Sequence, residues 1–385
     1  MGAAGLDGHR VAPCHEDAVG SFGGDSDASM RSPLPLTSKV EKMIRRSLCA
    51  LALVALLAAT SAHQANADPG GPGTEGQTPN SANPRGPVLR TAVDKLAAAL
   101  RCHDAPRSSD GEPALLVHGG ALTGSESWDW NYVPALNNAG INVCTVDLPD
   151  RALTDIQVSA EYVVYAVRQM REHYHSKVDI LGHSEGPVVA RWAIKFWPDV
   201  RNSVDDMVGL EAAYHGTAVT NIFCATGSCI PVAWQLAIGS NLLTALNADD
   251  ETPGEVSYTS IYSLTDDGVV PQLPQSVSEQ RDGATNVAIQ SICPARVVSH
   301  IQALTDAVAY AVVLDAFTHP GPADPSRIDR SVCGQLLLPG VTLASFAIHL
   351  ATISATLYTY STGIAYPTID REPPLRCYAR PDGCT

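Results

Sequence analysis

The sequence predicts an α/β fold built on a mostly parallel central sheet with helices on both faces. Short apolar runs of strand length recur along the chain, and helical periodicity appears between them, as over 162–170. The 385 residues are 45% hydrophobic, which is enough for a sizeable core. Strands separated by helices favour parallel pairing, because each crossover must leave room for a helix. The runs expected to form strands are 114–117, 143–146, 178–181, 207–210, 259–264 and 296–298.

The first 87 residues are expected to precede the folded domain. Residues 43–46 hold a start and two positive charges, 48–59 form a short apolar run, and Ala65-Asn66-Ala67 is a small-x-small cleavage signal. The apolar run is shorter than the roughly 20 residues that a membrane-spanning helix needs. We therefore predict an N-terminal extension plus signal peptide over 1–67 with cleavage after Ala67, a flexible linker over 68–87, and the folded domain over 88–385.

Net charge and cysteine content indicate which ligands the protein does not bind and in which compartment it acts. A formal net charge of −15 disfavours nucleic-acid binding, since phosphates would be repelled. Cys14 and Cys49 precede the predicted cleavage and leave eight cysteines, an even number that suits disulfides outside the cell. Lipidation at Cys49 is the alternative for the leader, but the residues before it are charged and polar. We find no Cys/His spacing typical of zinc and expect no metal.

A serine nucleophile is predicted where the run 178–181 meets Gly182-His183-Ser184-Glu185-Gly186. This is G-x-S-x-G, followed at once by a helical pattern over 187–194, so the motif has the strand, turn and helix that it requires. The serine must sit on a strained turn, and side chains two positions away would collide with the neighbouring strand and helix. We therefore predict that Ser184 attacks the substrate.

A serine nucleophile needs a base, and the base needs an acid, in the chain order Ser, acid, His. Three downstream histidines compete. His349 lies in an apolar helical stretch, and His319 lies in a turn detached from any strand. His300 directly follows the expected strand 296–298, so we predict that it is the base. Asp266 and Asp267 follow another strand; one should face the histidine and the other should be a solvated turn residue.

The oxyanion that forms during attack needs backbone N–H donors. The Gly-rich turn after the first strand, His118-Gly119-Gly120-Ala121, predicts Gly120 as one donor, and the residue after the serine, Glu185, as the other. A carboxylate facing the oxyanion would oppose it. Because a helix N-terminus favours an acid, we expect the Glu185 side chain to face outward.

With these residues placed, the chain resembles the lipase B family of the α/β-hydrolase fold, from about residue 88 to the C-terminus. The resemblance implies a lipase or esterase that needs no cofactor and carries a small cap or lid segment. It implies Ser184, Asp266 and His300 as the triad, and an acyl channel lined by the helix 341–358, with His349 in its wall. The segments that carry it are 114–117, 161–166, 189–192, 258–271, 297–300 and 378–381.

The resemblance also implies disulfides, Cys102 with Cys144 and Cys293 with Cys333, and less clearly Cys377 with Cys384. Cys224 and Cys229 are left over and are expected to pair locally in the cap segment.

Three positions depart from the family pattern. Gly120 stands where the family has a threonine that helps the oxyanion, Glu185 stands where it has a glutamine, and His183 stands where a tryptophan walls the alcohol pocket. These departures concern efficiency and substrate range more than the reaction type.

The sequence therefore predicts a secreted, monomeric serine hydrolase acting on lipid or other apolar acyl esters through an acyl-enzyme, with transient contact to a lipid interface. Two alternatives remain. An acyltransferase would use the same triad but pass the acyl group to another alcohol. A catalytically silent binding protein of the same fold is motivated by Gly120 and Glu185, although an intact Ser, Asp and His set counts against it.

Overall fold

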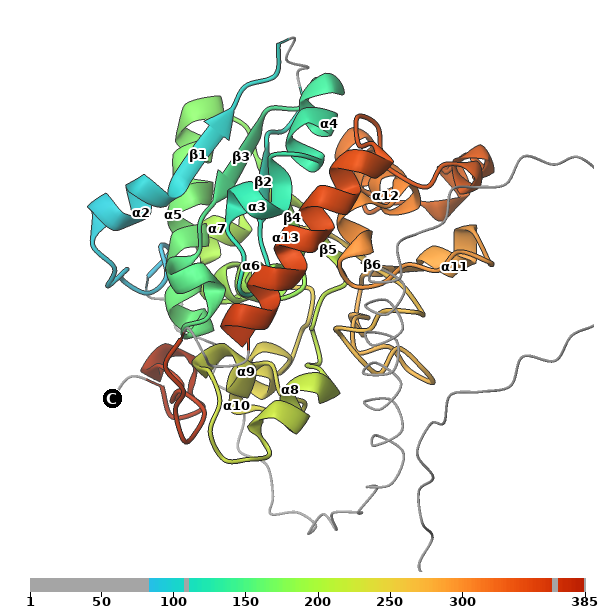
Figure 1. Ribbon diagram of the computed structural model, residues 1–385. Coiled ribbons are helices and arrows are strands. Elements are labelled where there is room, and N and C mark those ends of the chain that lie inside the picture. Colours follow the sequence, from blue (N-terminus) through green and yellow to red (C-terminus); the bar gives the residue numbers. More distant parts are fainter. Residues whose placement is uncertain (1–82, 107–110, 362–365, 384–385) are drawn as a thin grey trace, which may run out of the picture. The chain divides into compact units, whose positions relative to one another are not determined.

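The computed structural model describes residues 83–106, 111–361 and 366–383 (Figure 1). The predicted leader, its cleavage after Ala67 and most of the linker 68–87 lie outside the described residues. Three disulfides join described residues: Cys102–Cys144, Cys293–Cys333 and Cys224–Cys229, as predicted. Cys377 is also disulfide-bonded, but the predicted partner, Cys384, lies outside the described residues.

A seven-stranded sheet forms the centre of the described domain, in the order β1-β3-β2-β4-β5-β6-β7 (Figure 1). Only β1 runs antiparallel to its neighbour, β3, and all other pairs are parallel. The carboxyl ends of the parallel strands therefore share one edge, where their following loops can meet. The strands are β1 Leu100–His103, β2 Ala114–Val117, β3 Val143–Val146, β4 Val178–His183, β5 Val204–Leu210, β6 Ser257–Tyr262 and β7 Thr285–Ala288.

Five of the six predicted strands are present, and the prediction for 296–298 is wrong. That segment is a loop, which begins just after Pro294, and the preceding strand is β7 instead. Strand β7 has no apolar run in the sequence, because it buries only Val287. The edge strand β1 is half-exposed and has no apolar run either. Both depend on pairing with a neighbouring strand.

Helices cover both faces of the sheet. Alternate residues of β2 point to opposite sides: Leu115 and Val117 join one apolar core, and Ala114 and Leu116 join the other. Helices α2, α5 and α6 pack into the first core, and α3, α4 and α12 pack into the second. No helix among the described residues is both long and apolar enough to cross a bilayer. The helices outside the cap segment are α2 Val93–Ala99, α3 Gly124–Trp128, α4 Tyr132–Asn138, α5 Ile156–Tyr174, α6 Gly186–Phe196, α7 Pro198–Arg201, α11 Ile289–Ile292, α12 Ala307–Thr318 and α13 Leu343–Ser361.

The segment between β5 and β6 is the one for which a cap was predicted. It forms three short helices, α8 Ala218–Cys224, α9 Pro231–Gln235 and α10 Asn241–Leu246, which lie together in Figure 1. The Cys224–Cys229 bridge closes the turn between α8 and α9.

Candidate active site

Ser184 lies on a strained turn between β4 and α6, with φ of 61°. Its flanking glycines are required by close packing. A Cβ on Gly182 would lie 2.6 Å from the backbone nitrogen of Pro187, and one on Gly186 would lie 2.3 Å from the carbonyl oxygen of Val117. The elbow geometry expected from G-x-S-x-G is therefore present.

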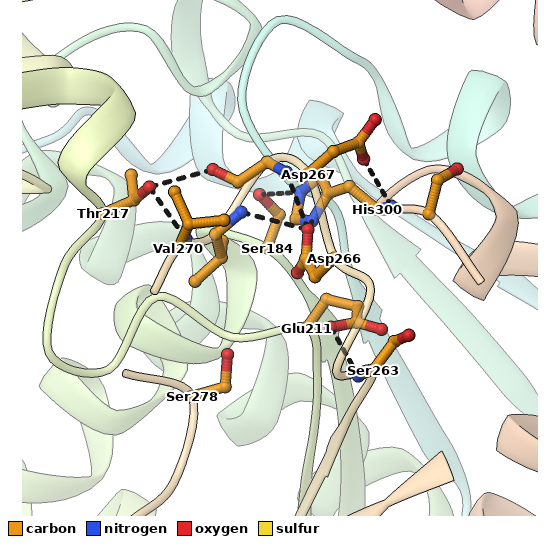
Figure 2. A network of polar contacts seen from close by, with 12 residues as sticks. Ser184, Glu211, Thr217, Ser263, Asp266, Asp267, Val270, Ser278 and His300 are labelled. Carbon is orange, nitrogen blue, oxygen red and sulfur yellow. Dashed lines mark hydrogen bonds and ion pairs between the residues drawn. The ribbon is translucent and has the colours of Figure 1, made fainter. Parts of the chain in front are cut away.

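The structure brings Ser184, His300 and Asp266 into one hydrogen-bonded chain (Figure 2). His300 Nε2 lies 2.9 Å from Ser184 Oγ, and His300 Nδ1 lies 3.1 Å from both carboxylate oxygens of Asp266. Asp267 is exposed and accepts a 2.9 Å hydrogen bond from the backbone N–H of His300. Of the two aspartates, Asp266 is the one that faces the imidazole.

The charges of this chain are set by burial and by its partners. Burial alone would raise the pKa of Asp266, but the neighbouring His300, Glu211 and the N–H of Val269 outweigh it and lower the pKa to about 2. Burial alone would lower the pKa of His300, but the Asp266 charge and hydrogen bond raise it overall. Asp266 is therefore ionised at neutral pH and orients the imidazole with Nδ1–H toward it.

Glu211, just after β5, was not predicted as a site residue. It is buried beside Asp266 (Figure 2), and one of its oxygens accepts a 3.0 Å hydrogen bond from the N–H of Ser263. Burial and then the Asp266 charge raise its pKa well above the usual range, so that Glu211 is protonated where Asp266 is ionised. The sequence feature that could have indicated Glu211 is an acidic residue immediately after a buried strand.

The loop that carries His300 is held by its neighbours and not by a strand. The Thr265 hydroxyl both donates to the carbonyl and accepts from the N–H of Val298, at 3.0 Å each. Gly268 lets the imidazole pack closely, since a Cβ there would lie 2.5 Å from His300 Cγ. Thr217 donates to the Gly268 carbonyl at 2.9 Å, which ties the acid loop to the segment after β5. Sequence reasoning missed this use of Gly268.

The Gly-rich loop after β2 passes directly beside the serine. A Cβ on Gly119 would lie 2.8 Å from Ser184 Cβ. His118 braces the loop from behind: its Nδ1–H donates to the Gly119 carbonyl at 2.8 Å, and its Nε2 accepts from the N–H of Leu148 at 2.9 Å. Burial lowers the pKa of His118, which keeps this ring neutral. Ala121, with φ of 66°, donates its N–H to the carbonyl of Arg151.

Comparisons with known proteins show which family the chain belongs to. The model of the family lipase (class 2) matches residues 111–312. The chain is 32% identical to lipase B from Pseudozyma antarctica over 304 residues, which cover 77% of this chain and 87% of that protein. The crystal structure of Aspergillus fumigatus lipase B superposes with a TM-score of 0.69 at 30% identity, covering 80% of this chain and 77% of that one.

The chain belongs to the class 2 lipase family. Its fold is the α/β-hydrolase fold, and it is a lipase-like carboxylic ester hydrolase, as the sequence predicted.

In this lipase, Glu185 is placed differently from the prediction. Its side chain does not face outward at the start of α6; it is 1% exposed, and neither carboxyl oxygen has a hydrogen-bond partner among the described residues. Oε2 lies 3.2 Å from the position that a Cβ on Gly120 would take. Burial raises the pKa of Glu185 well above its usual range. The acid turns inward because Gly120 leaves the space and because a protonated carboxyl can be buried at far lower cost than a carboxylate.

The two histidines expected in the lipase's substrate pocket have different surroundings. His183 is buried, its Nε2–H donates to the His300 carbonyl at 3.0 Å, and the two rings lie 4.7 Å apart. Burial and then His300 lower the pKa of His183 to about 3. His349 on α13 stacks on Trp130 at 4.2 Å. His319, the other candidate base, pairs with Asp315 instead.

One group of described residues in the lipase could hold a metal ion, namely Asp179, Asp205 and Asp206. They lie on β4 and at the start of β5, at the sheet edge opposite Ser184, and Lys177 contacts Asp205 at 2.8 Å. This group therefore has no contact with the candidate triad.

Proposed function

We propose that Ser184 is the nucleophile, His300 the general base and acid, and Asp266 the residue that orients and stabilises the imidazolium. The backbone N–H groups of Gly120 and Glu185 are the proposed oxyanion donors. The observation that carries this proposal is the continuous chain from Ser184 Oγ through both ring nitrogens of His300 to the Asp266 carboxylate. A catalytically silent binding protein would have no need of this chain.

The proposed reaction has two halves. Ser184 Oγ forms a bond to the ester carbonyl carbon as its proton moves to His300 Nε2, and the carbonyl oxygen becomes an oxyanion. When the intermediate collapses, the bond to the alcohol breaks and His300 gives its proton to the leaving oxygen. Water then attacks the acyl-serine with the same base and releases the acid and free Ser184.

We propose that the substrates are apolar acyl esters presented at a lipid interface. Helix α13 carries no Asp, Glu, Lys or Arg, yet Leu343 and Ile348 are each 66% exposed. Leu343 and Phe346 also line a hollow with the exposed side chains of Val297 and Leu336, close to the His300 loop. An apolar helix with exposed aliphatic side chains is suited to contact with a lipid surface.

We further propose that the protein is exported after cleavage at Ala67 and acts as a monomer, with the linker 68–87 ahead of the catalytic domain 88–385. The disulfides support export, because such bridges persist in oxidising compartments.

Active-site labelling tests the triad. A fluorophosphonate should label the mature wild-type protein and Ser291→Ala, which alters an exposed serine away from the site, but not Ser184→Ala. Hydrolysis of p-nitrophenyl butyrate should fall by about 10⁶-fold in Ser184→Ala. Folded wild-type protein that takes no label would falsify the assignment. Product analysis with an added alcohol distinguishes hydrolysis from acyl transfer.

Interface contact has its own test. With p-nitrophenyl esters of increasing chain length, activity should rise above the solubility limit, and Leu343→Ser with Ile348→Ser should reduce only that rise. An unchanged rise in the double variant would contradict the role proposed for α13.

A further inference from the structure

The oxyanion side of the site holds a buried acid without a partner. Glu185 is 1% exposed, and neither of its oxygens is hydrogen-bonded among the described residues. Its backbone is one of the two proposed oxyanion donors, and its Oε2 lies 3.2 Å from the Cβ position of the other, Gly120. Burying a carboxyl group without a hydrogen-bond partner costs free energy. The missing partner is explained if that partner forms only during the reaction.

The surroundings of Glu185 keep its proton in place. Burial is the cause that raises the pKa of this carboxyl, and no cation in the described part of the chain counters it. The titratable side chains on the adjoining elements include His118, on the loop after β2, as well as His183 and His300. Burial lowers the pKa of His118 and of His183, so these two rings are neutral; Asp147 and Arg151 act on His118 with opposite signs.

A neutral carboxylic acid can donate a hydrogen bond to an oxyanion, and a carboxylate cannot. The carboxylate only accepts hydrogen bonds and would repel an oxyanion, whereas the acid carries one O–H donor. In another enzyme class, a protonated aspartate serves in an oxyanion hole for this reason. Gly120 has no side chain that could donate, so the Glu185 carboxyl is the side chain placed to do so.

We propose that Glu185 is a catalytic residue that, in its neutral form, donates its O–H to the ester oxyanion as a third donor beside the N–H groups of Gly120 and Glu185. The inference rests on the triad and oxyanion donors proposed above. The O–H bond is not broken: Glu185 shares its proton with the oxyanion while the tetrahedral intermediate exists, and retains it when the carbonyl re-forms. The interaction is absent in the ground state, so it should act on kcat and not on KM.

Kinetics of Glu185→Gln and Glu185→Met across pH test the proposal, with Glu172→Gln, exposed on α5, as the control. With p-nitrophenyl butyrate, Glu185→Met should lose about 10²- to 10³-fold in kcat with KM within twofold, as for loss of one oxyanion donor. Glu185→Gln keeps a donor and cannot ionise. Its kcat should lie between wild type and Glu185→Met. We expect the kcat of wild type and of Glu172→Gln to fall at alkaline pH, where Glu185 ionises, and we expect no such fall in Glu185→Gln.

A boronic acid provides an independent measurement, because its adduct with a serine carries a negatively charged oxygen. The inhibition constant should rise by about 10²-fold in Glu185→Met, in parallel with kcat. The proposal is overturned if Glu185→Met keeps kcat within threefold of wild type, or if Glu185→Gln retains the wild-type alkaline fall. Should Glu185→Met fail to fold, Glu185→Gln decides. Failure of the triad itself would appear separately, as activity that survives in Ser184→Ala.

Discussion

The acid side and the oxyanion side of the candidate site differ in how their buried carboxyl groups are bonded. On the acid side, Asp266 accepts hydrogen bonds from the N–H groups of Gly268 at 2.7 Å and Val269 at 3.1 Å and also contacts His300. Its neighbour Glu211 accepts one from Ser263. On the oxyanion side, Glu185 is equally buried but has no partner among the described residues.

The two sides differ in their hydrogen bonding because they carry negative charge at different times. Asp266 is negative in the resting enzyme, so its partners must be in place before substrate arrives. The oxyanion exists only during the reaction, and the donors proposed for it stay unbonded until then. A site built in this way stabilises the transition state more than the bound substrate, which is the condition for a faster chemical step.

The acid side should show the larger effect when its charge is removed. Asp266→Asn replaces the carboxylate by an amide of the same shape, which cannot stabilise the imidazolium and can favour the wrong tautomer. We expect kcat to fall by about 10⁴-fold with little change in KM. Steady-state kinetics with p-nitrophenyl butyrate measure this. A loss smaller than that in Glu185→Met would reverse the comparison.

Packing on the acid side is predicted to be less tolerant than packing on the oxyanion side. A Cβ at residue 268 would lie 2.5 Å from His300 Cγ, whereas one at residue 120 would lie 3.2 Å from the flexible end of Glu185. We expect Gly268→Ala to displace the imidazole and lower kcat by about 10²-fold, and Gly120→Ala to lower it less. Thermal unfolding of both variants controls for stability. Equal losses in both variants would contradict this difference.

The fall in activity at low pH, the acid limb of the pH profile, depends only on the side of the site that holds Asp266. His300 must be neutral to accept the serine proton, and its pKa is raised, so kcat/KM should begin to fall at a higher pH than an ordinary histidine would give. Below that pKa the decline should approach tenfold per pH unit. In Asp266→Asn the raising charge is gone, and the limb should move to lower pH. A limb that does not move would show that another group controls it.

Glu211 should give the smallest effect. It is already neutral, so Glu211→Gln changes little in the charge near Asp266, and we expect kcat within about threefold of wild type. The acid limb should stay within a few tenths of a pH unit. A large loss would mean that Glu211 does more than lie beside Asp266, and the two buried glutamates would then be more alike than their bonding indicates.

Sequence alone predicted the features that depend on local rules. Short apolar runs of strand length placed five strands, and G-x-S-x-G placed the elbow, because both patterns follow from the geometry of neighbouring residues. The prediction that His300 lies in this region rested on a strand expected just before it. A loop and not a strand precedes it.

Tertiary structure decided what depends on segments distant in the chain. Which of Asp266 and Asp267 faces the imidazole, and whether Glu185 turns inward, are settled by packing against residues far away in sequence. Protonation follows the same rule. Glu185 and Glu211 hold their protons because the folded chain excludes water from them, and solvent exclusion is a property that no short stretch of residues has by itself.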